Sequence, residues 1–138
     1  MNREKIPKNL IDKLKSLGVG VVYLFGSQVQ GTTHFDSDID FGVVLIKPAL
    51  LNNTEKKLDI YSKLYDFFTD FIPNKDIDVV LLQEVSLSVQ FQAIKNSKIL
   101  YEVSPIFRAD FEESVVKFYL DFKPYLEERY KAILERIK

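Results

Sequence analysis

Three aspartates stand close together in the first third of the chain, within the stretch FGSQVQGTTHFDSDIDFGV of residues 25–43. Asp36, Asp38 and Asp40 are spaced two residues apart. Alternate side chains of a strand point to one face, roughly 6.5 to 7 Å apart along the chain, so Asp38 and Asp40 can converge on one cation. Asp40 also lies among apolar residues, where a carboxylate needs a partner. Magnesium fits this pattern, because it is a hard cation that takes oxygen ligands and keeps room for phosphate oxygens.

A third carboxylate comes from a later apolar segment. Asp78 interrupts the run IDVV of residues 77–80, which again places a charge inside a strand pattern. Asp76 could share its face, but it ranks second because it lies at the mouth of the strand beside Lys75. Carboxylates from two neighbouring strands can hold two ions about 4 Å apart, as in two-metal nucleotidyl transfer.

Two other interpretations of the acidic cluster compete with the magnesium site. Aspartate and serine are good turn formers, and we expect Asp36 to lie in such a turn or at the surface. A calcium loop of the EF-hand kind is rejected. It requires a glycine where Phe41 stands and a glutamate where Lys47 stands.

Gly26 and Ser27 end the apolar run that precedes the aspartates. Backbone N–H groups at such a turn bind phosphate, the glycine allows close approach, and the serine hydroxyl adds a donor. Gly31 supplies a second flexible point, and Ser37 either caps the turn or contacts phosphate. These four residues are the predicted nucleotide-binding group. We expect the only histidine, His34, to be a surface residue, the alternative being that it supplies a cation to the phosphates.

The apolar pattern predicts the elements that position these residues. The expected strands cover 19–25, 39–45, 77–82 and 99–101, the last at an edge, and the expected helices cover about 10–17, 54–72, 86–97 and most of the chain from 105 onward. We expect Thr54 to cap its helix and Pro124 to kink or restart the last one. The second helix has an apolar stripe of Leu58, Tyr61, Leu64, Tyr65, Phe68 and Ile72. The class is α/β or α+β, and the strand–helix–strand connection of the second and third strands favours a parallel pair.

Composition bounds the remaining possibilities. The 138 residues suit a single domain, with an α/β core over about 1–104 and C-terminal helices over about 105–138. The net charge of −1 provides no electrostatic footprint for nucleic acid. The chain has no cysteine, no signal-peptide pattern and no apolar run near the ~20 residues that span a bilayer, so we expect a cytoplasmic protein without a membrane partner.

The C-terminal part has an aromatic stripe of Phe107, Phe111, Phe118 and Phe122. Such a stripe is most often a core face, and we expect it to be buried. Tyr119, Tyr125 and Tyr130 lie off or beside it and would form a partner-docking surface if they are exposed.

The run GSQVQGTTHFDSDID, with ten residues between Ser27 and Asp38, resembles the signature of the polymerase-β-like nucleotidyltransferases and of their minimal nucleotidyltransferase (MNT) branch. The resemblance continues through IDVVLL. The tail RADFEESVVKFYLDFKPYLEERY looks like that of MNT antitoxins encoded beside HEPN-domain toxins. The resemblance implies a mixed sheet flanked by helices, with a C-terminal helical tail.

The resemblance also implies roles for individual residues. Asp38 and Asp40 would bind magnesium, and two ions are expected. Asp78 would help to activate the attacking hydroxyl, by metal coordination or as a base. Gly26 and Ser27 would hold the triphosphate of ATP.

The implied reaction is the transfer of AMP from ATP to a tyrosine of a HEPN ribonuclease toxin, which silences the toxin. Gln28 and Gln30 stand where the family often has arginine, so the phosphate-binding mouth is less basic than usual. Two alternatives stay open. The chain could be an antitoxin that acts by occlusion without chemistry, or a nucleotidyltransferase whose acceptor is a small-molecule hydroxyl of the aminoglycoside kind.

Overall fold

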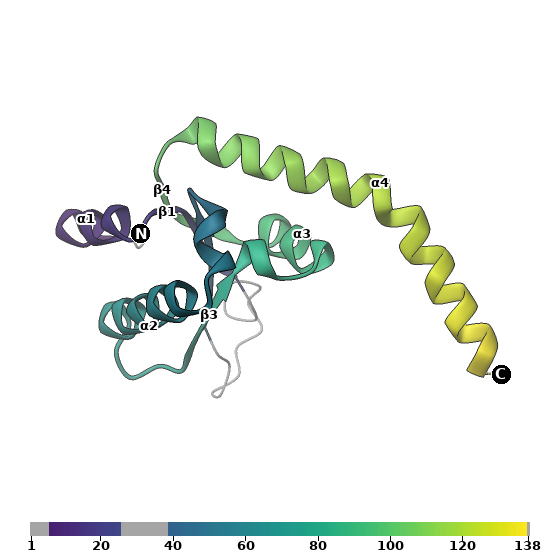
Figure 1. The fold of residues 1–138 in the computed structure, drawn as a ribbon, viewed down its shortest axis with the longest axis horizontal. Coiled ribbons are helices and arrows are strands. Elements are labelled where there is room, and N and C mark those ends of the chain that lie inside the picture. The colour runs from purple at the N-terminus through teal and green to yellow at the C-terminus, as the bar shows by residue number, and fades with distance from the viewer. Residues whose placement is uncertain (1–5, 26–38, 138) are drawn as a thin grey trace.

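The computed structural model describes residues 6–25 and 39–137, and in this part of the chain four strands form one sheet in the order β3-β2-β1-β4 (Figure 1). β1 pairs antiparallel with both β2 and β4, and β2 pairs parallel with β3. The sheet is therefore mixed, as expected, and the predicted parallel pair is confirmed. The strands are β1 (Val19–Phe25), β2 (Ile39–Leu45), β3 (Ile77–Leu81) and β4 (Lys98–Glu102).

Helices cover both faces of the sheet. They are α1 (Lys8–Ser16), α2 (Thr54–Phe71), α3 (Leu87–Lys95) and α4 (Pro105–Ile137), with short 3-10 turns η1 (Pro48–Asn52) and η2 (Leu82–Glu84). α1 and α2 pack on one face, and α3 and the start of α4 pack on the other (Figure 1). The larger core lies under α1 and α2, where the ring of Phe41 in β2 stacks on Phe68 of α2 at 4.0 Å between centroids.

The helix ends follow local chemistry. Ser86 caps α3 by accepting a hydrogen bond from the N–H of Val89. Gly18 follows α1 with a φ of +79°, a conformation that glycine adopts without strain. The prediction of Thr54 as the cap of α2 is wrong by one residue. Asn53 is the cap, and its side chain accepts from the N–H of Lys56.

The predicted apolar stripe of α2 is only partly confirmed. Leu64 and Phe68 are fully buried, but Leu58 and Tyr65 are exposed. Ile60 and Phe67 are buried instead. The buried side of α2 therefore consists of Ile60, Leu64, Phe67 and Phe68, and it packs in the core with the apolar side chains of β2 and β3.

The C-terminal part of the chain is one long helix, α4, with Pro124 inside it. Residues 105–119, here called the proximal segment, lie against the body, and the ring of Tyr119 stacks on Phe91 of α3 at 4.0 Å between centroids. Residues 120–137, the distal segment, are all exposed and extend away from the body (Figure 1). The expectation that Phe118 and Phe122 are core residues is wrong, since both are 51% exposed. No helix in the described part of the chain is long and apolar enough to cross a membrane.

Candidate functional site

Asp40 and Asp78 are neighbours across the parallel pair of β2 and β3. Their Cα atoms are register partners, between the pairs Ile39–Ile77 and Phe41–Val79. Partner residues of adjacent strands point to the same face of the sheet, and strands lie ~4.8 Å apart. The structure thus brings together two carboxylates that lie far apart in the sequence.

Strand alternation decides which face the two carboxylates share. Phe41 and Val79 belong to the core under α1 and α2, whereas Val44 and Val80 pack with α3 and α4. The even-numbered residues of β2 and β3, Asp40 and Asp78 among them, therefore point to the face of the sheet that carries α3 and α4. Asp40 is half-buried and Asp78 is exposed, so a ligand can reach the pair from solvent.

The end of β1 lies beside the same pair. Phe25, the last residue of β1, is the register partner of Asp40. The chain therefore leaves the sheet at the level of Asp40, directly before the predicted phosphate-binding segment. The remaining predicted site residues lie outside the described part of the structure. They are Gly26, Ser27, Gly31, Ser37 and Asp38, together with Gln28, Gln30, His34 and Asp36 of the same segment.

The two described carboxylates suit magnesium by their donor chemistry. Carboxylate oxygens are the hard ligands that this ion prefers, and a site with few protein ligands leaves room for phosphate oxygens. Among the described residues, no group of three histidine, cysteine or acidic side chains could hold a metal ion. Asp38 would bring the set to three. It directly precedes Ile39 in the chain, and its role stays a prediction.

The register of β2 against β3 is fixed at both ends. At the start, the N–H of Ile39 donates to the carbonyl oxygen of Asp76 at 3.0 Å. At the far end, the side-chain amide of Gln83 bonds both backbone groups of Leu45. It accepts from the N–H at 2.8 Å and donates to the carbonyl oxygen at 2.8 Å. These bonds hold Asp78 opposite Asp40, because a shift of the strands would break them.

Tyr61 of α2 is a neighbour of the site that the sequence did not indicate. Burial raises the pKa of the Tyr61 phenol, and the negative charge of nearby Asp78 raises it further. Its ring stacks on Tyr65 at 6.4 Å between centroids. The spacing of four residues between the two tyrosines was visible in the sequence, but only the fold shows that Tyr61 comes near Asp78.

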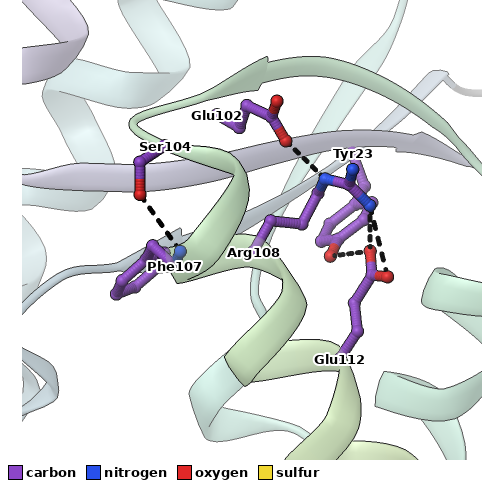
Figure 2. Close-up of polar contacts among 6 residues, drawn as sticks. All are labelled: Tyr23, Glu102, Ser104, Phe107, Arg108 and Glu112. Carbon is purple, nitrogen blue, oxygen red and sulfur yellow. Dashed lines mark hydrogen bonds and ion pairs between the residues drawn. The ribbon is translucent and has the colours of Figure 1, made fainter.

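A polar cluster anchors the proximal segment of α4 to the sheet (Figure 2). The hydroxyl of Tyr23 in β1 donates to Glu112 Oε2 at 2.7 Å. Arg108 binds both Glu112 and Glu102, the latter from β4. The hydrogen bond with Glu102 is the main cause that raises the pKa of Arg108. Burial, and then the hydrogen bond with Glu112, raises the pKa of Tyr23.

A hollow of about 360 Å³ lies between α1 and α2, on the face opposite to the one that Asp40 and Asp78 share. It has a mixed lining of lysines, aspartates and apolar residues: Lys13, Ser16, Leu17, Lys63, Asp66, Phe67 and Asp70. Its position separates it from the paired aspartates, so we do not assign it to the same site.

Comparison with known proteins gives a family and a fold. The family described as Polymerase beta, Nucleotidyltransferase matches residues 8–106. No curated protein sequence matches the chain. One similar solved structure is a toxin–antitoxin with AMP-PNP, in which a chain is 24% identical over 96% of this chain and 98% of that chain, with a TM-score of 0.63. Another is a tri-AMPylated Shewanella oneidensis HEPN toxin in complex with an MNT antitoxin, in which a chain is 19% identical over 94% of this chain and 97% of that chain, with a TM-score of 0.56. A third, a MntA–HepT toxin–antitoxin, has 18% identity over 95% and 98% of the two chains and a TM-score of 0.55.

Proposed function

Since the chain belongs to the polymerase β nucleotidyltransferase family, we propose that it transfers AMP from ATP to a tyrosine of a HEPN-domain toxin and acts as the antitoxin of that toxin. The observation that carries the proposal is the pairing of Asp40 with Asp78 across β2 and β3, at the end of β1. The solved structures with this fold include a toxin–antitoxin with AMP-PNP and a HEPN toxin that carries AMP groups. Both are consistent with the proposed substrate and acceptor.

The reaction forms one bond and breaks one bond at the α-phosphorus of ATP. The phenolic oxygen of the tyrosine attacks this phosphorus, the bond to the bridging oxygen of the β-phosphate breaks, and pyrophosphate leaves. The proton of the phenol passes to a base, for which Asp78 is the candidate because it is exposed and lies beside Asp40. Magnesium bound by Asp38, Asp40 and Asp78 would neutralise charge on the phosphates and on the attacking oxygen.

AMP on a tyrosine would inhibit a ribonuclease through its size and its negative charge. It adds bulk and a negative charge to a surface that has to bind the phosphate backbone of RNA. Like-charge repulsion then opposes binding of the substrate. A protein acceptor also fits the net charge of this chain, which is close to zero and gives no electrostatic attraction for RNA.

The test is a transfer assay with ATP labelled at the α-phosphate, magnesium and a HEPN-domain protein as the acceptor. We expect the label to appear on a tyrosine of the HEPN protein, and to be lost with Asp40→Asn. This variant keeps the size of the side chain and removes its charge. Transfer that survives both Asp40→Asn and Asp38→Asn would contradict the proposed site.

The same variants separate the alternative functions. An antitoxin that acts only by occlusion would protect cells from the toxin equally well with both aspartates replaced. An enzyme with a small-molecule acceptor would label an aminoglycoside-type hydroxyl and leave the HEPN protein unlabelled. Either result would replace the proposal.

A further inference from the structure

The distal segment of α4 has an apolar stripe that nothing in the described chain covers. Its members recur every three or four residues, which places them on one side of the helix. They are Phe122 (51% exposed), Leu126 (38%), Tyr130 (69%), Ile133 (45%) and Ile137 (74%), here called the distal stripe. A contiguous row of large apolar side chains on a surface marks an interaction site.

The distal stripe continues the face by which α4 packs on the body. Phe111 and Val115 precede it with the same spacing, and both are at least half-buried against the body. Tyr119 belongs to the same side and stacks on Phe91 of α3. One side of α4 is thus an interface with α3 as far as Tyr119, and then extends beyond it. An element that covers the distal stripe would lie in line with α3 and pack as a helix against a helix.

The charges around the distal stripe indicate what kind of partner covers it. Arg129 and Arg136 follow Leu126 and Ile133 by three residues, so both line one edge of the stripe. In an antiparallel pair of two copies, this edge would face its own counterpart and bring the arginines together. A partner with acidic side chains beside an apolar face fits the edge better.

The opposite side of the distal segment argues against a lipid surface. Asp121, Glu128 and Glu135 recur every seven residues and lie away from the distal stripe. Helices that lie on membranes have lysine and arginine on their polar side, because that side faces anionic lipids. Lys131 lies on this side as well, so the side is mainly but not wholly acidic, which is typical of a helix whose back faces water.

From these observations we infer that the distal stripe and its arginine edge form the docking site for the acceptor protein, which presents a helix with an apolar face and an acidic rim. This inference rests on the proposed function, because it identifies how the acceptor of that reaction is held. α4 packs on the face of the sheet to which Asp40 and Asp78 point. A protein held on α4 therefore lies on the same side as the two carboxylates. Docking there makes delivery of the tyrosine effectively intramolecular, which raises its local concentration at the site.

The first experiment places the same new charge on the two sides of one helical turn. Ile133→Asp puts a carboxylate into the distal stripe, and Lys131→Asp puts one on the opposite side as the matched control. Binding of the full chain to the HEPN-domain acceptor protein is measured by calorimetry. We expect Ile133→Asp to raise Kd about tenfold or more, and Lys131→Asp to change it less than about threefold.

The second experiment tests the charged edge without disturbing the apolar side chains. We expect Arg129→Glu combined with Arg136→Glu to raise Kd and to reduce its dependence on salt, because attraction across the rim is screened by salt. This pair of variants also keeps the inference testable if Ile133→Asp were to weaken the helix, which circular dichroism would reveal.

Three results would overturn the inference. The first is equal Kd values for Ile133→Asp and the unchanged chain. The second is a free chain that forms a dimer at higher concentration while the Ile133→Asp variant stays a monomer, since a second copy would then cover the stripe. The third is sedimentation with vesicles of anionic phospholipid that Ile133→Asp abolishes. A failure of the proposed function differs from all three, because the unchanged chain would then not label the HEPN protein at all.

Discussion

The β2–β3 strand pair and the distal segment of α4 are opposite kinds of surface. The strand pair is fixed from several directions: by the stack of Phe41 on Phe68, by the register with β1, and by the amide of Gln83 at its far end. Every residue of the distal segment is exposed, including its largest apolar side chains. Catalytic groups have to be held in fixed positions, whereas a surface that recognises a protein can stay exposed until the partner binds.

The two halves of α4 sharpen this contrast, because they share one periodicity. Val115 of the proximal segment is 3% exposed, while Ile133 occupies an equivalent side of the same helix and is 45% exposed. The proximal segment is also anchored by the cluster of Tyr23, Arg108 and Glu112 (Figure 2). Periodicity therefore tells which side of a helix is covered, but not by what.

The largest expected effect is on activity at the strand pair. We expect Asp78→Asn to lower the rate of AMP transfer about a thousandfold, equivalent to ~4 kcal/mol of transition-state stabilisation, because it removes a metal-binding or proton-accepting carboxylate. Asp76→Asn is the matched control, since Asp76 is an exposed carboxylate two residues earlier, before the start of β3. Equal losses in the two variants would show that the register partner of Asp40 has no special role.

The next effect compares the proximal and distal segments by one substitution in each. We expect Val115→Asp to lower the free energy of unfolding by about 3 kcal/mol, because it buries a charge without a partner. The matched Ile133→Asp should change it by less than about 0.5 kcal/mol in the free chain, because that side chain already faces water. Chemical denaturation measures both, and a large loss in Ile133→Asp would mean that the distal segment is part of the folded body.

A smaller effect is expected at the far end of β2. Gln83→Ala leaves the N–H and the carbonyl oxygen of Leu45 without their side-chain partner, and should lower the free energy of unfolding by about 2 kcal/mol. It should also lower the rate of transfer, because the register that aligns Asp78 with Asp40 is weakened. Gln92→Ala serves as the control, since Gln92 is exposed and, within residues 6–25 and 39–137, its side chain bonds only Asn96. Denaturation and transfer assays that do not distinguish the two variants would count against a role for Gln83.

The smallest effect concerns pH and the anchor of α4. Burial raises the pKa of Tyr23 above the ordinary value of 10.0. Above that pH the unfolded chain releases the phenolic proton while the folded chain keeps it, so stability falls as the pH rises. We expect Tyr23→Phe to cost about 1 kcal/mol near pH 7, by loss of the hydrogen bond to Glu112, and to make the decline above pH 10 shallower. Tyr130→Phe, at an exposed position, is the control and should leave the stability near pH 7 unchanged.

The sequence predicted the strands of the site almost residue by residue. Val19–Phe25 is an almost unbroken apolar run that ends before Gly26, and Ile39–Leu45 is apolar apart from Asp40 and Gly42. The structure has both strands at these bounds. Asp78 was recognised because a charge inside an apolar strand is conspicuous. The register that places Asp78 opposite Asp40 could not be predicted from the sequence, because pairing between strands depends on contacts that are remote in sequence.

Other features escaped prediction for the same physical reason. The two hydrogen bonds between the side chain of Gln83 and the backbone of Leu45 join residues that are 38 positions apart. Tyr61 comes near Asp78 only through the packing of α2, and the aromatic stripe of the tail was expected to be buried as far as Phe122, although the body ends near Tyr119. Helical periodicity has no information about where the covering element stops. The roles of Gly26, Ser27 and Asp38 stay predictions.

Steady-state kinetics of AMP transfer, with the HEPN protein as the varied substrate, tests the division between chemistry and docking most directly. The account predicts that Asp78→Asn loses kcat/KM through a fall in kcat, and that Ile133→Asp loses it through a rise in KM for the acceptor. A fall in kcat for Ile133→Asp with no rise in KM, or full activity in Asp78→Asn, would contradict it.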